Sequence, residues 1–304
     1  MNDSIFKPEG FFPIKESYTL SALERAKITG QIIEGKAVMC DSNCNLTVSL
    51  GDFKGIIPKE MAAIGIDDGS TKEIAVLSRV NKQVCCKVID IIKTGGEISL
   101  VLDRRSSQQE ALEYMLCSYK PGDIVDAKIT HIEPFGVFAD IGCGIVGLIS
   151  IENISVSRIA HPKDRFYTGQ NIKAIIKSID HAQKRFTLSH KELLGTWQEN
   201  ADMFAIGQTV CGSIRSIENY GIFVELSPNL AGLAEYTTLA ETGQQATVYI
   251  KNIIPEKMKV KLNIIDTFYG EQRPEPPKYY ISSNHIDNFI YSPPSSEKMI
   301  ETIF

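Results

Sequence analysis

Two phenylalanines, Phe135 and Phe138, stand three residues apart in a stretch of alternating apolar and polar residues. Side chains at even spacing share a face of a strand, so a plain strand would place these rings on opposite faces. A β-bulge at Gly136 could bring them to one face, because glycine tolerates the bulged backbone best. The inward face of this strand is already supplied by three apolar side chains: Val137, Ala139 and Ile141. The spacing therefore predicts an outward aromatic pair, on which unpaired bases could stack with about 1–3 kcal/mol per base.

The charge of the chain is unevenly distributed. The 304 residues carry a formal net charge of −5, which argues against a general electrostatic attraction to nucleic acid. Residues 120–196 nevertheless hold 10 basic and 8 acidic side chains and four of the five histidines. RNA contacts are therefore expected first in this middle segment, around the two rings. The alternative interpretation is that one or both rings belong to the core, as most Phe side chains do.

An internal repeat predicts the architecture. Residues 125–141 align without a gap over 210–226, and 175–188 align over 249–262. Short runs of alternating polarity between Gly, Asn, Asp and Pro predict β-strands in each copy. A repeat of about 70 residues suits a closed five-stranded barrel, which leaves few exposed strand edges. A more divergent copy precedes these two, with a strand-like alternation at 46–50.

We therefore expect an all-β chain of three tandem five-stranded antiparallel barrels joined by short helices. The expected segments are a divergent barrel at 1–105, a helical connector at 106–119, a central barrel at 120–189, a second helical connector at 190–204, a shortened barrel at 205–266 and a tail at 267–304. Trp197 in the second connector is expected to anchor a core. The tail is rich in aromatic residues and in proline, including Pro274, so we expect it to pack back on the third barrel.

The middle copy carries an ordered series of glycine, aliphatic, aromatic and charged positions: Gly122, Val125, Ile132, Phe135, Gly136, Phe138, Gly147, Leu148, Gly169, Ile172, Ile176, Asp180, Arg185, Leu188 and Ser189. This order resembles the S1 RNA-binding domain, a family named for a bacterial ribosomal protein. The whole chain is similar to three-repeat S1-domain proteins of Gram-positive anaerobes. The resemblance implies OB-fold barrels and single-stranded RNA as the ligand.

The resemblance also implies roles for individual residues of the middle copy. The stacking aromatics of the family fall on Phe135 and Phe138, and its surface acid and base fall on Asp180 and Arg185. A planar guanidinium can contact phosphate or lie on a base. Asp180 could hold Arg185 in place or accept from a base edge, and a plain surface pair is the alternative.

The middle copy departs from the family at one position, because the family's histidine on the third strand is Ser150 here. This change removes a stacking or protonatable group and should weaken binding. His131 at a strand end could partly substitute for it, although a lone exposed histidine is usually incidental. Lys128 is a further basic residue on the neighbouring strand and is counted among the candidate RNA contacts.

The other two copies keep less of the pattern. The third retains the aromatic pair as Tyr220 and Phe223 and has Lys259 at the position of the basic residue, with Arg215 as a further possible contact. It is therefore expected to bind RNA more weakly. The first copy has residues 40–44 where the aromatic pair should stand, so it is expected to serve as a structural or protein-docking barrel, with the ribosome as the candidate partner.

The leading hypothesis is a non-catalytic, mRNA- or ribosome-associated protein that binds single-stranded RNA. The alternatives are a protein–protein adaptor built on degenerate barrels and an accessory factor of RNA decay or transcription. The sequence shows no two-metal acidic cluster, phosphate-binding glycine loop or nucleophile signature, so no enzyme activity, cofactor or small-molecule substrate is expected. Cys40 and Cys44 lack the partners of a zinc site. Without a membrane span or secretory signal, the expected location is the cytoplasm.

Overall fold

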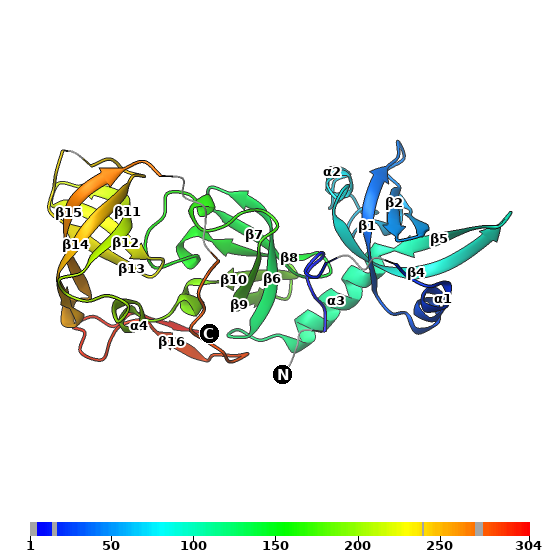
Figure 1. Ribbon diagram of the computed structural model, residues 1–304. Coiled ribbons are helices and arrows are strands. Elements are labelled where there is room, and N and C mark those ends of the chain that lie inside the picture. The colour runs from blue at the N-terminus through cyan, green and yellow to red at the C-terminus, as the bar shows by residue number, and fades with distance from the viewer. Residues whose placement is uncertain (1–4, 14–16, 239, 271–275) are drawn as a thin grey trace.

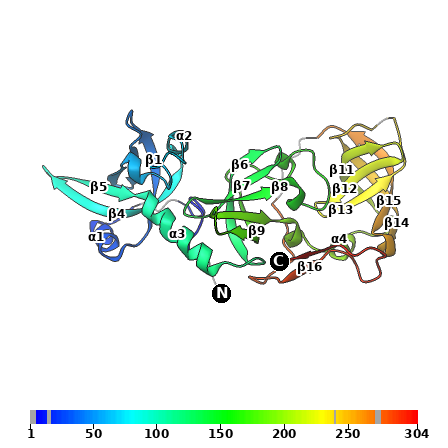
Figure 2. The same ribbon diagram turned by 180° about the vertical axis from the view of Figure 1, so that it is seen from behind.

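The computed structural model describes residues 5–13, 17–238, 240–270 and 276–304. Within these residues the chain forms three closed five-stranded barrels, which lie in a row when seen from either side (Figures 1 and 2). The predicted all-β architecture of tandem barrels is therefore confirmed. No helix in the described part of the chain is long and apolar enough to cross a membrane.

Each barrel uses the same five-strand plan. The first contains β1 (Ile33–Cys40), β2 (Leu46–Leu50), β3 (Phe53–Ile57), β4 (Gln83–Thr94) and β5 (Glu97–Asp103). The middle contains β6 (Ile124–Glu133), β7 (Gly136–Gly142), β8 (Ile145–Ser150), β9 (Asn171–Asp180) and β10 (Arg185–Ser189). The third contains β11 (Thr209–Glu218), β12 (Gly221–Ser227), β13 (Leu230–Ala234), β14 (Gln245–Ile254) and β15 (Lys259–Phe268). Neighbouring strands are antiparallel except for one parallel pair per barrel: β3 with β5, β8 with β10, and β13 with β15.

The alternation of the strands explains why the barrels close. In β7 the side chains of Val137, Ala139 and Ile141 are fully buried in the barrel core. Since successive side chains point to opposite faces, Phe138 and Asp140 point to the outer side of the barrel, where the N-terminal segment covers Asp140. Each barrel has its own cluster of buried apolar side chains, which supplies the burial that stabilises it.

Helices lie beside the barrels. α1 (Leu20–Thr29), which the sequence did not predict, packs Leu23 and Ala26 on the first barrel. α3 (Arg104–Ser118) joins the first and middle barrels and packs Met115 into the middle core. The second connector is less helical than expected, because it contains a 3-10 turn, η4 (Lys191–Leu194), and a short α4 (Trp197–Ala201).

The N-terminal segment at residues 5–13 ties the first barrel to the middle one. The buried Glu9 carboxylate accepts two hydrogen bonds from the Arg104 guanidinium, at 2.7 and 2.8 Å, and its backbone N–H donates to Asp140 at 2.7 Å. Burial raises the pKa of Asp140 to about 7, and the neighbouring Glu9 charge adds to the effect. Burial alone would also raise the pKa of Glu9, but the adjacent Arg104 lowers it overall, so Glu9 stays ionised. The junction is therefore held by a desolvated ion pair.

The C-terminal tail reaches further than the third barrel. Phe289 and Tyr291 pack into the third core, and β16 (Asn288–Ile290) pairs with β17 (Glu301–Ile303). Upstream, the Tyr279 hydroxyl accepts from the Lys173 N–H of the middle barrel at 2.9 Å. The tail thus bridges the middle and third barrels, a role that its aromatic content alone did not reveal. Pro274 lies outside the described residues.

Candidate nucleic-acid interface

The two phenylalanines of the middle barrel lie together on its outer surface. Phe135 is 54% exposed, Phe138 is half-buried, and their ring centroids are 6.2 Å apart at an interplanar angle of 89°. Perpendicular rings cannot lie under the same base, so each ring offers its own contact to a ligand. We call this part of the middle barrel, with Phe135 and Phe138, the stacking face.

The rings share a side for a different reason than predicted. Phe135 stands in the turn before β7, and Gly136 pairs regularly with Glu133 and with Ser150, so the expected bulge at Gly136 is wrong. The irregularity lies in β6 instead, between Ile129 and His131. Gly136 is needed for close approach, since a Cβ there would stand 2.3 Å from the Ile149 carbonyl oxygen. The turn, rather than a bulge, brings Phe135 beside Phe138.

Strand register defines what surrounds Phe138. One row of paired positions crosses the barrel in the order His131, Phe138, Leu148, Thr187, Ser178. Ser150 pairs with Gly136 at the edge of the same surface. Its hydroxyl donates to Glu152 at 2.7 Å and accepts from Asn153 at 2.8 Å, so these neighbours hold it within its turn.

Asp180 and Arg185 are directly paired across β9 and β10, yet no ion pair joins these two described residues. The Asp180 carboxylate instead accepts from the Gln183 N–H at 2.9 Å and closes the hairpin turn. The interpretation that Asp180 positions Arg185 is therefore wrong. Arg185 is exposed and has no ion-pair partner among the described residues, so its guanidinium is available to a ligand.

The two other candidate residues of the middle barrel differ in position. His131 is exposed, its Nε2 lies 2.6 Å from Glu133, and its ring centroid lies 6.5 Å from that of Phe138. His131 therefore borders the stacking face. Lys128 is only partly exposed, and its ammonium donates to the Gly10 carbonyl of the N-terminal segment. Lys128 thus faces the first barrel rather than the rings.

The third barrel repeats the aromatic geometry. Tyr220 is 70% exposed, and its ring centroid lies 6.1 Å from that of Phe223 at 88°. Both rings line a pocket of about 320 Å³ that also includes Arg158 from the loop between β8 and β9 of the middle barrel. Sequence reasoning missed Arg158, because nothing local shows that this loop reaches the next barrel. Lys259 is exposed at the start of β15, opposite Ile254.

Arg215 of the third barrel lines the same pocket as Tyr220 and Phe223 and also has a structural role. Its guanidinium donates to the Glu225 carboxylate at 2.9 and 3.2 Å, and the same carboxylate binds Arg165 of the middle barrel. Asp164 lies 3.4 Å from Arg215. Arg215 therefore belongs to an ion-pair network that joins the two barrels.

The first barrel has no aromatic ring at the equivalent positions. Its row of paired residues runs Met39, Thr47, Ile56, Val101, with Thr47 in the place that Phe138 takes in the middle barrel. Met39 and Ile56 are exposed on either side of Thr47. This surface is apolar but lacks the flat rings that stacking requires.

The fold and site together define a class. Closed five-stranded barrels with one parallel closing pair, repeated three times and carrying outer aromatic pairs on the middle and third copies, are OB-fold barrels of the nucleic-acid-binding type. Residues 118–191 match the family "S1 RNA binding domain", and the middle barrel is a member of that family.

The particular relatives are ribosomal. The chain is 29% identical over 289 residues to the small ribosomal subunit protein bS1 of Staphylococcus aureus, across 88% of this chain and 71% of that protein. It is 30% identical over 200 residues to bS1 of Chlamydia trachomatis, across 61% of this chain and 35% of that protein. A solved multidomain protein with nucleic acid binding domains from Streptococcus pneumoniae is 13% identical, with 84% of this chain and 76% of that chain covered and a TM-score of 0.23. The chain thus contains a match to the S1 RNA binding domain in its middle barrel and is similar to bS1 over most of its length.

Proposed function

We propose that the chain is a non-catalytic protein that binds single-stranded RNA in translation, as an mRNA- or ribosome-associated factor in the cytoplasm. The observation that carries this proposal is the perpendicular aromatic pair that recurs with nearly the same geometry on two barrels. Base stacking on such rings needs no particular sequence, because every base has a π-face. The similarity to bS1 supports the assignment to translation.

The contacts expected on the middle barrel follow from side-chain availability. Phe135 and Phe138 would stack bases, and Arg185 would contact phosphate or a base. His131 would lie at the edge of the bound strand, and Ser150 and Asp180 would contribute through the turns that they hold. On the third barrel the corresponding contacts are Tyr220, Phe223 and Lys259, joined there by Arg158.

Stacking requires unpaired bases, so the chain should bind a labelled oligouridine at least about tenfold more tightly than a duplex of equal length. Fluorescence anisotropy titrations of both probes at one salt concentration measure the difference. Equal affinity for the two probes would indicate a purely electrostatic surface, and the absence of binding to either would overturn the proposal.

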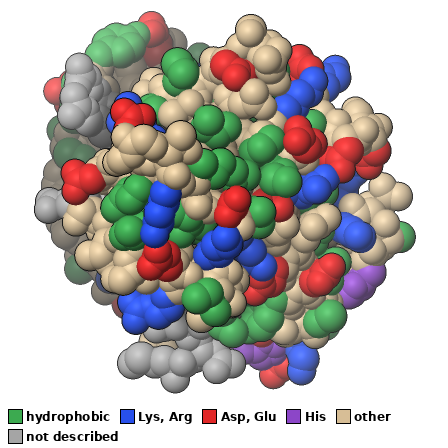
Figure 3. Space-filling model, turned by 90° about the vertical axis from the view of Figure 1, so that its right-hand side faces the viewer, with side chains coloured by type: hydrophobic (Ala, Val, Ile, Leu, Met, Phe, Trp, Pro, Cys, Tyr) green, Lys and Arg blue, Asp and Glu red, His purple; other side chains and the backbone are tan. Residues whose placement is uncertain are grey.

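A second candidate function concerns the first barrel, which we propose as the contact with the ribosome. Figure 3, which faces this end of the molecule, shows hydrophobic side chains gathered among charged ones of both signs. Exposed large side chains on the first barrel include Val38, Met39, Ile56, Ile89 and Ile92. Apolar side chains of this size at one end of a protein are typical of a docking surface for another macromolecule.

The double substitution Met39→Asp/Ile56→Asp should abolish co-sedimentation with small ribosomal subunits and leave oligouridine binding within about twofold, because charge on an apolar contact is costly to desolvate. Ile74→Asp, at an exposed site in α2 (Ile74–Leu77), is the matched control. Co-sedimentation that survives Met39→Asp/Ile56→Asp would contradict the ribosome contact. If the chain binds a protein partner but has no affinity for RNA, the adaptor alternative is favoured.

A further inference from the structure

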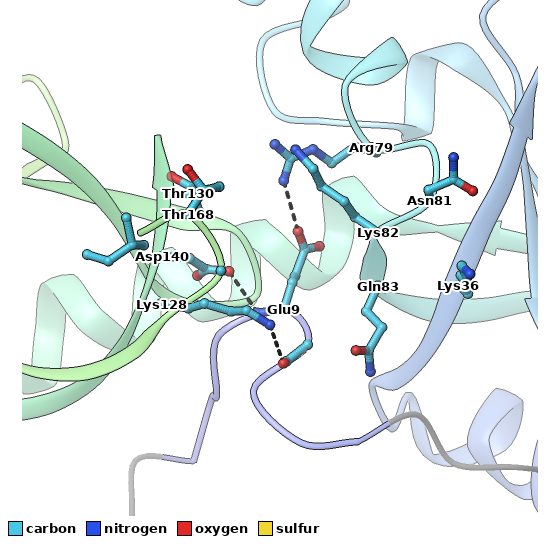
Figure 4. A pocket seen from close by; sticks show the side chains of 13 residues that line it. Glu9, Lys36, Arg79, Asn81, Lys82, Gln83, Lys128, Thr130, Asp140 and Thr168 are labelled. Carbon is cyan, nitrogen blue, oxygen red and sulfur yellow. Dashed lines mark hydrogen bonds and ion pairs between the residues drawn. The ribbon is translucent and has the colours of Figure 1, made fainter. Parts of the chain in front are cut away.

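A pocket of about 410 Å³ lies between the first and middle barrels, and we call it the interbarrel pocket. Four basic side chains from the two barrels line it: Lys36, Arg79, Lys82 and Lys128. Figure 4 shows Arg79 and Lys82 with their cationic ends close together, and Thr130 and Thr168 across from them on the middle barrel. The pocket therefore brings cations of one barrel opposite threonine side chains of the next.

The two acids that line the pocket offset these cations only in part. Glu9 lies 3.4 Å from Arg79, but its carboxylate is also bound bidentately by Arg104, a further cation. The Asp140 carboxylate accepts three backbone N–H groups, from Glu9, Gly142 and Gly144, and its raised pKa leaves it only partly charged near neutral pH. The pocket therefore keeps a surplus of positive charge, which attracts anions.

Two of the four cations have no partner in the described part of the chain. The ammonium groups of Lys36 and Lys82 make neither an ion pair nor a hydrogen bond there, whereas Lys128 donates to Gly10 and Arg79 lies 3.4 Å from Glu9. Burial and the nearby charge of Arg79 lower the pKa of Lys82, which shows that these neighbouring cations repel each other. An anion between them would relieve the repulsion.

The backbone holds the cations of the first barrel in fixed positions. The turn after α2 is hydrogen-bonded to β1 twice: the Ala37 N–H donates to the Lys82 carbonyl at 2.9 Å, and the Asn81 N–H donates to the Ala37 carbonyl at 2.8 Å. Lys36 precedes Ala37 on the same strand. Because these anchors are backbone hydrogen bonds, the main chain that carries the basic side chains is already fixed. It therefore loses little further freedom when a ligand binds.

The interbarrel pocket adjoins the stacking face. Thr130 lines the pocket, and its hydroxyl donates to the Phe138 carbonyl at 3.1 Å. Lys128 stands two residues earlier on the same strand, β6. A strand of RNA stacked on Phe138 and continued across β6 would therefore carry its backbone to the mouth of the pocket.

We propose that the interbarrel pocket binds a phosphate group of the RNA backbone beside the stacked bases. The first barrel, which has no stacking rings, then contributes to RNA binding through Lys36, Arg79 and Lys82. This inference rests on the proposed RNA-binding function and names a second part of the same site. The ligand chemistry is a phosphate group, whose source is either the RNA backbone or free phosphate.

The double substitution Lys36→Gln/Lys82→Gln tests the pocket in the full chain. Each phosphate contact on a single strand contributes about 0.7 to the slope of log affinity against log salt, so loss of the one phosphate in the pocket should make the variant's slope about 0.7 smaller in magnitude. Its affinity for oligouridine at low salt should fall roughly tenfold. The variant Lys27→Gln/Lys93→Gln is the matched control, since it removes the same charge from exposed pairs with Asp90 and Glu24 outside the pocket. The slope of this control should equal that of the wild type.

The outcomes separate the two proposals. Wild-type binding with an unchanged slope in Lys36→Gln/Lys82→Gln overturns the pocket assignment and leaves the stacking face intact. An equal fall in slope for both lysine pairs also overturns it, because the effect would then reflect net charge alone. No binding by the wild type overturns both proposals. Inorganic phosphate added at constant ionic strength should not displace the RNA; if it does so in the wild type but not in Lys36→Gln/Lys82→Gln, the pocket binds free phosphate instead.

Discussion

Replacing Phe135 and Phe138 together by alanine should lower the affinity for oligouridine by roughly 30-fold or more, since each stacked base contributes about 1–3 kcal/mol and 1.4 kcal/mol is tenfold. The loss should be nearly the full sum of the two rings, because their perpendicular planes serve different bases. Phe135 is largely exposed, and Phe138 lies on the outer side of β7, so truncation leaves the barrel core filled. Anisotropy titration of the variant against the wild type measures the change.

The third barrel suggests the matched control for this experiment. Tyr220 stands where the middle barrel has Phe135, so Phe135→Tyr keeps an aromatic face that the fold already accepts. Its affinity should stay within about threefold of the wild type. Tyr220→Ala/Phe223→Ala should lower the affinity for oligouridine less than the middle-barrel double substitution does. In the third barrel Ile254 and Lys259 stand where the middle barrel has the acid and the guanidinium. If Phe135→Ala/Phe138→Ala binds oligouridine within twofold of the wild-type affinity and has an unchanged circular dichroism spectrum, the stacking face is not the RNA-binding site.

Replacing Glu9 by alanine should destabilise the junction of the first and middle barrels by about 3–5 kcal/mol, the usual result of leaving one buried charge without its partner. Arg104 is almost fully buried, and the Glu9 carboxylate is its bidentate partner. The Cys85 N–H, which donates to the same carboxylate at 3.1 Å, would also lose its acceptor. Urea unfolding followed by circular dichroism should show the first transition at a lower midpoint.

A second substitution distinguishes a lost ion pair from a lost contact. Glu9→Ala/Arg104→Met removes both charges and should recover much of the stability that Glu9→Ala loses, because the desolvated cation is gone. Lys27→Ala breaks the exposed pair with Asp90 and should cost less than about 1 kcal/mol. If Glu9→Ala is no more destabilising than Lys27→Ala, the N-terminal segment does not hold the junction.

The barrels and the aromatic pairs could be predicted from the sequence because their signals are local. Alternation with period two predicts which side chains of β7 face inward. Because Val137 and Ala139 are the inward positions, Phe138 between them is predicted to face outward, without any knowledge of the neighbouring strands. The repeat then extended the same assignment to Phe223. The position of the irregularity was beyond this reasoning, because Gly136 can serve either a bulge or a close approach, and only the neighbouring β8 backbone decides between them.

The contacts of charged side chains are the feature that the sequence predicted least well. Lys128, Arg215 and Asp180 were all expected to contact RNA, and the sequence did not reveal that in the structure they also bind Gly10, Glu225 and a hairpin turn. A long charged side chain can reach in several directions, and its partner is chosen by whichever oppositely charged or polar group the fold brings near.

The sequence by itself determined three repeated barrels and the outward rings of the middle and third ones, since strand alternation and side-chain type suffice for both. Tertiary structure alone decided how the barrels are joined and which cations remain available. Glu9 meets Arg104 across 95 residues of sequence, and the interbarrel pocket draws its lining from both barrels. Such contacts depend on how separately folded units pack, and no pattern within one strand carries that information.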